Sequence, residues 1–229
     1  PGHRDSGMTA LRSTRAGSTR SRSTRSEATR EAILGAAERL YAENGVVSVS
    51  NRQVGDAAGQ SNSAVVGYHF GSKEDLVRAI VVRRAEGVER IRSGHVAAIR
   101  ERADLRAWVS ALVLPSTQYF AELGAPTWYA RFASQVMTDP VLRPILVDEA
   151  LSSSTLRETV AGAISCLPPI PADVRSARGT MARTLLTHVM AEREADFASS
   201  GADAKAYWAA CGIDLVDAIV GIWSAPVSR

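Results

Sequence analysis

Apolar residues recur at helical spacing over most of the chain. The first run lies between Thr29 and Gly45 and consists of Ile33, Leu34, Ala37, Leu40 and Tyr41. Asn44-Gly45 is a typical helix stop, because glycine readily adopts the left-handed conformation after a last turn. The pattern predicts a first helix from about residue 29 to 44.

Short helices follow, and their starts are marked by residues that cap helices. Ser50 and Gln53 have the spacing of a capping box, which predicts a helix over residues 51–58. Gly59 permits a sharp turn, and Ser61 is a candidate cap for another helix over residues 61–67. Ser72 with Asp75 predicts the start of a long fourth helix.

The remaining segments also have helical patterns. Proline, glycine and serine residues divide them, notably Pro115, Gly124, Pro140, Pro144 and the 168–171 connector. The predicted helices cover residues 104–114, 116–123, 127–137, 141–167 with breaks near 144 and 152–154, 172–197, and 202–223. No alternating strand pattern and no tandem repeat is found, so the sequence predicts an all-α fold.

The N-terminal segment, residues 1–26, has a different composition. It repeats Arg-Ser-Thr-Arg and contains hardly any apolar residue, so we expect a disordered arm. Residues 1–30 carry seven arginines against Asp5 and Glu27, whereas the formal charge is balanced over residues 31–92 and slightly negative beyond. This asymmetry indicates a polyanionic partner at the N-terminal end.

Composition and motifs narrow the class of protein. The chain has 229 residues, of which 45% are hydrophobic, which is enough for a sizeable core. Its uninterrupted apolar runs are much shorter than a membrane helix, and the two cysteines have no metal-ligand spacing, so we expect a cytoplasmic protein without a membrane partner. We find no nucleophile elbow and no phosphate-binding loop, and His188 has only Glu192 at helical spacing. The sequence therefore predicts no enzymatic activity, no bound cofactor and no metal site.

The stretch from residue 53 to 67 fits a helix-turn-helix. Val54, Ala58 and Val65 can lock two short helices together, with Gly55 and Gly59 at the close approach and the turn. Packing through Val65 leaves an outward face for the major groove. Small polar side chains on that face can read base edges, and a valine can touch a thymine methyl. The predicted outward residues are Ser61, Asn62, Ser63, Val66 and Gly67.

Residues 53–76, QVGDAAGQSNSAVVGYHFGSKEDL, resemble the signature of TetR-type transcriptional regulators. The matching elements are the Ala58-Gly59 turn, Tyr68-His69-Phe70, and Gly71 to Leu76 at the start of the fourth helix. The resemblance covers about residues 29–80. It implies a helix-turn-helix domain over residues 27–72, joined to a helical domain over residues 73–229 for ligand binding and dimerisation.

The resemblance also implies roles for residues beside the recognition helix. Tyr68 and His69 would contact phosphates, and Phe70 would pack in the module's core. Lys73, at a helix N-terminus, is placed to favour a phosphate, as is Arg52 on the second helix. Each has an alternative: Lys73 and Arg52 as solvated charges, Tyr68 as a packing residue, and His69 as a cap of the junction.

The C-terminal domain contains an aromatic-rich stretch whose residues are either core or ligand pocket. Pockets are usually apolar with a few polar groups. The candidate ligand-binding residues are Trp108, Phe120, Trp128, Tyr129, Phe132 and Met137. Arg131 and Gln135 share a helical face and either orient a ligand or lie at the surface.

The resemblance implies a homodimer on double-stranded palindromic operator DNA, released by a small-molecule effector. The last two predicted helices carry apolar stripes that a two-fold interface would cover. They are Met181, Leu185 and Val189, followed by Trp208, Cys211, Leu215, Ile219 and Ile222. A nonspecific DNA-binding protein that uses the basic arm alone is the alternative function.

Overall fold

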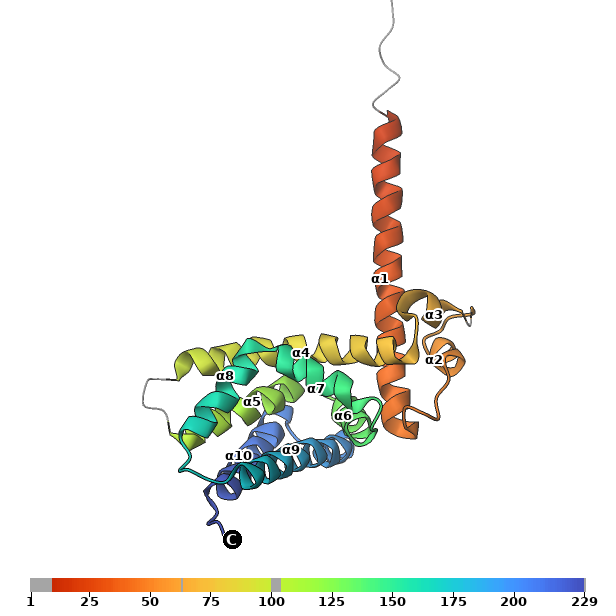
Figure 1. Cartoon of the computed structure of the whole chain (residues 1–229). Coiled ribbons are helices and arrows are strands. Elements are labelled where there is room, and N and C mark those ends of the chain that lie inside the picture. The colour runs from red at the N-terminus through yellow and green to blue at the C-terminus, as the bar shows by residue number, and fades with distance from the viewer. Residues whose placement is uncertain (1–9, 63, 100–103, 229) are drawn as a thin grey trace, which may run out of the picture.

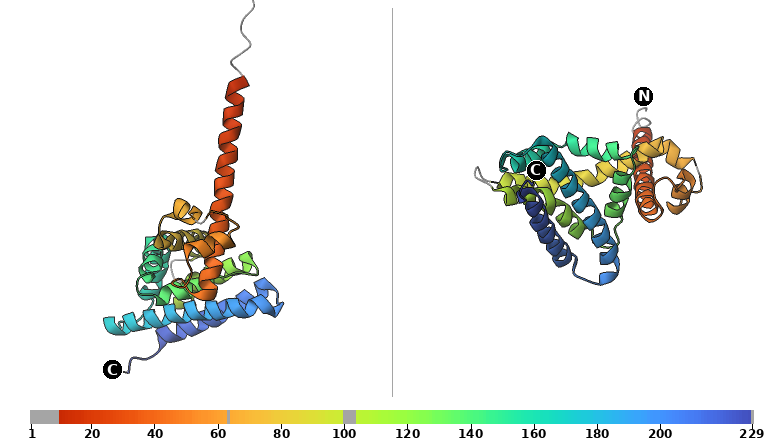
Figure 2. Two further views of the ribbon diagram at one scale, coloured as in Figure 1. Left: turned by 90° about the vertical axis from the view of Figure 1, so that its right-hand side faces the viewer. Right: turned by 60° about the horizontal axis from the view of Figure 1, so that its bottom comes forward.

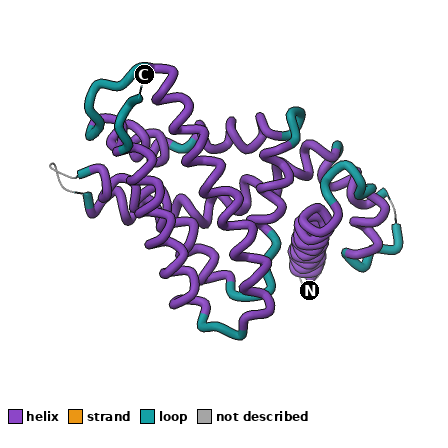
Figure 3. Tube along the Cα trace, turned by 90° about the horizontal axis from the view of Figure 1, so that it is seen from below, coloured by secondary structure: helices purple, strands orange, loops and turns teal. Residues whose placement is uncertain are grey.

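The computed structural model describes residues 10–62, 64–99 and 104–228, with side chains from residue 24 onward, and these residues form helices and connecting loops without a strand (Figures 1 and 3). The helices are α1 (Ala10–Asn44), α2 (Asn51–Ala57), α3 (Val65–Phe70), α4 (Lys73–Ala98), α5 (Leu105–Leu123), α6 (Tyr129–Thr138), α7 (Arg143–Ser152), α8 (Ser154–Ser165), α9 (Ala172–Ser200) and α10 (Ala204–Ser224). The predicted all-α fold is confirmed.

Helix α1 is much longer than predicted, because its backbone is helical from Ala10 rather than from Thr29. Its N-terminal part projects away from the rest of the molecule (Figures 1 and 2). The prediction of a disordered arm is therefore wrong for residues 10–26, while residues 1–9 lie outside the described residues. Extending an existing helix adds one hydrogen bond per residue, whereas starting one is costly, so the packed half of α1 can propagate into this segment.

Helix α5 also differs from its prediction. We expected a break at Pro115, but the helix runs through it. Proline has no N–H for the carbonyl of Ala111, four residues earlier. The Nη1 atom of Arg92 donates to that carbonyl at 3.1 Å and to the carbonyl of Leu112 at 3.0 Å. A side chain from α4 thus satisfies the acceptor that the proline leaves free.

Two hydrophobic cores hold the helices together. The first combines α1 to α4 with Phe132 and Val136 of α6 and Leu142 and Ile145 at α7. The second joins α5, α9 and α10. The first core therefore extends well beyond residue 72, and the predicted boundary between the two domains is crossed by a continuous apolar core.

Helix α10 packs along α5, and α9 lies beside α10 (Figures 2 and 3). Four residues of the predicted dimer stripe, Trp208, Cys211, Leu215 and Ile219, are buried inside the chain. Their assignment to a surplus stripe was wrong, because they contact α5. Ile213 of α10 and Met181 of α9 are instead exposed, at 59% and 57% of their surfaces.

By length and composition α10 is apolar enough to cross a membrane, which the search for uninterrupted apolar runs missed. One such helix is weak evidence for a membrane span, since core helices of globular proteins meet the same test. Here one face of α10 is the partner of α5 in the second core.

Candidate nucleic-acid interface

Helices α2 and α3 form the predicted helix-turn-helix. Ser50 and Gln53 make a complete capping box at the start of α2, and Gly59 provides the turn with a φ of 70°. Gly55 is buried at the crossing, where a Cβ would lie 3.8 Å from side-chain atoms of both Val65 and Val66. The backbones therefore approach closely, as a helix-turn-helix requires.

The recognition helix α3 starts four residues later than predicted. Its first residue is Val65, and Ser61 makes no cap. The turn is held by Asn62, whose Oδ1 atom accepts a hydrogen bond from the backbone N–H of Ala64 at 2.9 Å. Ser63 lies outside the described residues. Short polar side chains often form such local bonds in place of a helical turn.

This shift in register overturns one predicted contact. Val66 was placed on the groove face, but it is fully buried, whereas Val65 is half-buried. With the helix beginning at Val65, positions 66 and 70 are one turn apart and both face the core. Val66 therefore locks the module and has no surface for a base.

The exposed face of the module contains the other described candidates. Tyr68 is 85% exposed, and Ser61, Asn62 and Gly67 are exposed near it. Arg52 on α2 is also exposed and lies 3.8 Å from Asp56, one turn along the helix. An aromatic side chain this exposed contributes nothing to the module's core, which excludes the packing alternative for Tyr68.

His69 and Lys73 have structural contacts of their own. The half-buried His69 ring packs edge-on against Tyr68, with centroids 5.1 Å apart. Lys73 Nζ donates to the carbonyls of Val46 and Val47 at 3.0 and 3.4 Å, so α4 is fastened to the loop before α2. Two of its three N–H donors are used, and one remains for a phosphate.

Sequence reasoning missed Arg30, which fastens the recognition helix to α1. Its guanidinium carbon lies 4.3 Å from the centroid of the Phe70 ring, and its Nη1 donates to the carbonyl of His69 at 3.1 Å. A cation is favourable at the carbonyl end of a helix and over an aromatic face. The partners are about forty positions apart in sequence, so no local pattern indicates the contact.

The predicted ligand residues do not form one pocket. Tyr41, Phe132, Tyr129, Phe120 and Trp208 make a line of ring contacts from α1 to α10, with successive centroid distances of 6.2, 6.1, 6.3 and 5.0 Å. Phe120, Tyr129 and Phe132 are thus core residues.

Two other candidate ligand residues also pack against neighbouring helices. Trp128 packs against the first core. Trp108 covers Gly162 of α8, where a Cβ would lie 2.3 Å from the indole ring. Five of the six candidates are thus packing residues. The sixth, Met137, lines a cavity.

That cavity, of about 390 Å³, lies among the helices of the C-terminal half. Its walls are almost entirely apolar, and α8 and α9 contribute the most residues to them. The lining residues are Arg92, Val109, Leu112, Ser116, Met137, Leu146, Ala150, Leu156, Val160, Ala163, Ile164, Leu167, Gly179, Ala182, Arg183, Leu186, Ile219 and Trp223. Spacing alone could not identify them, because they come from seven separate helices.

Helix α6 connects the cavity domain to the DNA-binding module. Its Phe132 enters the first core, and its N-terminus is capped from α9 by Glu194, which is 1% exposed. The Glu194 carboxylate accepts from the backbone N–H groups of Ala130 and Arg131 at 3.1 and 3.0 Å, and from Arg131 Nε at 3.2 Å. Arg131 therefore does not point at a ligand but completes this cap.

No group of three or more histidine, cysteine, aspartate or glutamate side chains is arranged to hold a metal ion in the described part of the chain. His188 is exposed, and its Nδ1 lies 3.2 Å from Ser134 Oγ.

Comparison with known proteins agrees with this geometry. Residues 33–80 match the family model described as bacterial regulatory proteins, tetR family. These residues form a tetR-family DNA-binding module. The match covers α2, α3, most of the packed part of α1 and the start of α4, which are the elements of the helix-turn-helix module.

Solved structures of the family share the fold. The fatty acid degradation regulator FadR from Bacillus halodurans is 17% identical, with a TM-score of 0.57, over 82% of this chain and 94% of its own. The tetR-family regulator PfmR from Thermus thermophilus is 18% identical, with a TM-score of 0.50, over 81% of this chain and 97% of its own. A search of curated proteins finds no match. The chain therefore combines the DNA-binding module of tetR-family regulators with a helical fold that these solved structures share.

Proposed function

We propose that this protein is a repressor that binds a palindromic operator as a homodimer and leaves it when a small molecule occupies the C-terminal cavity. The observation that carries the proposal is the exposed face of α3 and its turn, in which Tyr68 and Asn62 project from a module whose other side is locked by Val66 and Phe70. A rigid, outward-facing polar surface on a short helix suits the major groove.

Individual DNA contacts follow from the exposed atoms. Asn62 uses its carbonyl oxygen in the turn, so its amide N–H donors remain for a base edge or a phosphate. Tyr68 can donate its hydroxyl to a phosphate, and Arg52 offers a charge on the neighbouring helix. Ser61 and Gly67 let the backbone approach the groove, while Lys73 and His69 lie at its margin.

Dimerisation would use the outer face of α10 together with α9. That face is built from small residues around Ile213, namely Ala206, Ala209, Ala210 and Gly221, all of which are exposed. Two such faces can meet closely around a two-fold axis, because small side chains let helix backbones approach. A dimer would present two recognition helices to successive major grooves.

Release would operate through α4, which runs from the module along the helices of the C-terminal half (Figure 1). Lys73 fastens its first residue to the loop before α2, and Arg92 near its other end lines the cavity. A ligand that prefers one position of α4 would shift the spacing of the two recognition helices. It can do so only by its difference in affinity between the two states.

Selection of binding sites from a random pool of duplex DNA tests the DNA-binding part. We expect a palindromic site that competitor DNA does not displace at equal concentration. Tyr68→Ala should weaken binding to selected and random DNA about equally, whereas Asn62→Ala should cost about 1–3 kcal/mol on the selected site alone if its amide reads a base. Glu43→Ala, an exposed change on α1, is the control.

Binding without any sequence preference would contradict repression and favour the nonspecific alternative. Deleting residues 1–24 then shows whether the basic segment binds the DNA backbone. If it does, the slope of log affinity against log salt becomes shallower by about 0.9 for each phosphate that the shortened protein no longer neutralises.

Light scattering tests the dimer. We expect about twice the 24.4 kDa chain mass for the wild type and a monomer for Ile213→Glu. Leu215→Glu cannot test the dimer interface, because Leu215 is buried in the second core and a charge there would unfold the chain. Ala161→Glu, on the exposed side of α8, is the matched control, and an Ile213→Glu dimer would refute this interface.

A further inference from the structure

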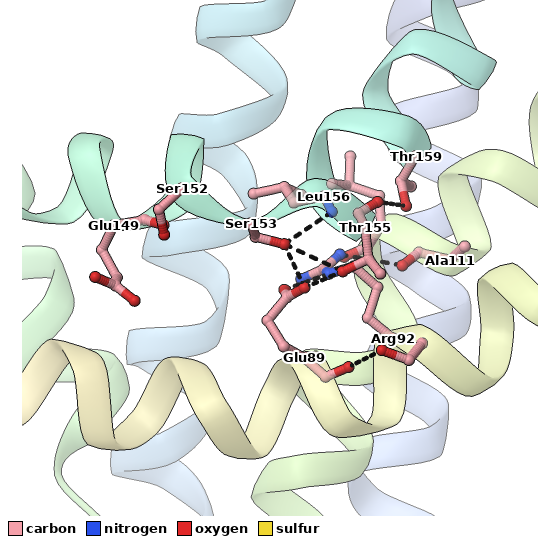
Figure 4. Close-up of polar contacts among 11 residues, drawn as sticks. Glu89, Arg92, Ala111, Glu149, Ser152, Ser153, Thr155, Leu156 and Thr159 are labelled. Atoms are coloured by element: carbon pink, nitrogen blue, oxygen red, sulfur yellow. Dashed lines mark hydrogen bonds and ion pairs between the residues drawn. The ribbon is translucent and has the colours of Figure 1, made fainter.

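The cavity has an apolar wall with one buried cation in it. Arg92 is 5% exposed, and its Nε donates to Glu89 Oε1 at 2.7 Å, while its Nη1 serves the carbonyls of Ala111 and Leu112 (Figure 4). The Nη2 atom makes no hydrogen bond to any described residue. It is also not among the side-chain atoms sealed from solvent without a partner.

A second polar group lies on α5, one helical turn after Leu112. Ser116 lines the same cavity and is half-buried, and its hydroxyl makes no hydrogen bond within the described part of the chain. An Arg92 N–H and a Ser116 hydroxyl are therefore the polar groups that α4 and α5 offer to an occupant. Both donors are open to the cavity rather than sealed in the core, so an occupant that supplies an acceptor can hydrogen-bond to them.

The charge around Arg92 determines which acceptor fits. Glu89 also accepts hydrogen bonds from Ser153 and Thr155 at the start of α8. Burial alone would raise the pKa of the Glu89 carboxyl, but the hydrogen bonds from Ser153, Thr155 and Arg92 outweigh it and hold its pKa below the ordinary value. The Arg92–Glu89 pair is thus electrically neutral. A carboxylate on Nη2 would leave a net negative charge in an apolar site.

Arg183, the other cation at the cavity, has a different environment. It lies on α9, is exposed, and forms no ion pair with a described residue. Exposed charges contribute little to binding because water and salt screen them. The cavity volume of about 390 Å³ corresponds to roughly a dozen non-hydrogen atoms, at about 30 Å³ for a water-sized group.

We propose that the effector is an uncharged, largely aliphatic molecule of about this size whose carbonyl oxygen accepts hydrogen bonds from Arg92 Nη2 and Ser116. The inference rests on the proposed function, in which this cavity holds the effector. Arg92 is then a specificity-determining residue that also holds the carbonyl freed by Pro115 and, through Glu89, the start of α8. Occupancy of the cavity bears directly on how α4, α5 and α8 are joined.

The test uses 2-decanone and decanoate, which have equal chain length and differ in charge. Each is titrated into the full-length, DNA-free protein at pH 8 and followed by tryptophan fluorescence, to which Trp223, one of four tryptophans, contributes from the cavity wall. We expect 2-decanone to bind at least tenfold more tightly than decanoate. Equal or tighter binding of decanoate would show that the ligand is an anion and overturn the proposal, as would a failure of 2-decanone to bind.

Variants test whether 2-decanone binds in this cavity. Ala163→Leu fills the cavity from α8 and should abolish binding of 2-decanone, whereas Ala161→Leu, on the exposed side of the same helix, should leave it unchanged. Arg92→Met alone risks unfolding, since it orphans the carbonyl of Ala111. We therefore place it in a Pro115→Ala background, where residue 115 again donates an N–H to that carbonyl.

Comparison of Pro115→Ala with the double variant then isolates the ligand contact, and we expect the double variant to bind 2-decanone about tenfold more weakly. Equal affinities would remove Arg92 from recognition and overturn its role. DNA release is measured separately on the selected site. If 2-decanone binds the cavity without releasing DNA, the proposed repression mechanism fails while the ligand class stands.

Discussion

In the DNA-binding module the starts of α2 and α4 are capped by neighbouring residues, whereas in the C-terminal half two helix ends are completed by buried charges that are distant in sequence. Ser50 with Gln53 and Ser72 with Asp75 cap α2 and α4 over three positions. Glu194 caps α6 from 64 positions away, and Arg178 donates to the carbonyls of Trp223, Ala225 and Pro226 at the end of α10. The C-terminal half also has local caps at the starts of α5, α8 and α10, so the two regions differ in the buried charges that complete helix ends.

The two kinds of helix cap should differ in how much they stabilise the folded protein. Local caps are solvent-exposed, so losing one exposes backbone groups that water can satisfy. The distant caps are buried charges, and removing one leaves several polar groups without partners in an apolar core. We therefore expect changes to the distant caps to cost more stability, and the following experiments are ordered by that expectation.

Glu194→Ala should have the largest effect, lowering the free energy of unfolding by about 3–5 kcal/mol, because it orphans two backbone N–H groups and the Arg131 guanidinium. Urea denaturation followed by circular dichroism measures the loss. Glu192→Ala, two residues earlier and exposed, is the control. A loss below about 1 kcal/mol for Glu194→Ala would remove the distinction between the two regions.

Arg92→Met should cost about 2–3 kcal/mol in the wild type, since it leaves the carbonyl of Ala111 and the Glu89 carboxylate without their donor. The cost should fall by about 1 kcal/mol in Pro115→Ala, whose new N–H serves the same carbonyl. A double-mutant cycle measured in urea gives this coupling. Additive effects would mean that Arg92 does not compensate for the proline.

Ser50→Ala and Ser72→Ala should each cost about 1 kcal/mol, the usual effect of losing a local cap. Thermal unfolding followed by far-ultraviolet circular dichroism compares them with Ser48→Ala, an exposed loop change that removes no cap. Losses as large as that of Glu194→Ala would show that the module is no less dependent on its caps than the C-terminal half.

Asp75 should give the smallest effect, and one that depends on pH. Hydrogen bonds from the side chain and backbone of Ser72 lower its pKa below the ordinary 3.8. A carboxyl with a depressed pKa stabilises the folded state above its unfolded pKa and loses this contribution as pH falls through the folded value. Asp75→Asn should therefore lower the melting temperature at pH 7 and converge with the wild type as the pH falls through the depressed pKa of Asp75 in the folded state. A difference independent of pH would contradict this.

Only part of the DNA-binding site could be predicted from the sequence. The turn at Gly59 and the cap at Ser50 follow from local patterns, and the structure agrees. For Tyr68 the sequence left packing and an outward position open, and the structure shows it exposed. The start of α3 was misplaced because Asn62 holds a turn where Ser61 was predicted to cap a helix, and that shift buried Val66. Arg30 contacts Phe70 only after α1 and α3 are folded together, so no sequence window contains both.

The sequence by itself determined the helical class, the helix-turn-helix and most helix boundaries, because spacing, caps and turn residues act within a few positions. Tertiary structure decided that α5 passes through Pro115, that most of the aromatic residues form a core, and that Arg92 stands in a cavity wall. These outcomes depend on side chains from separate helices meeting in a dry interior, where each buried polar group must find a partner wherever the fold provides one.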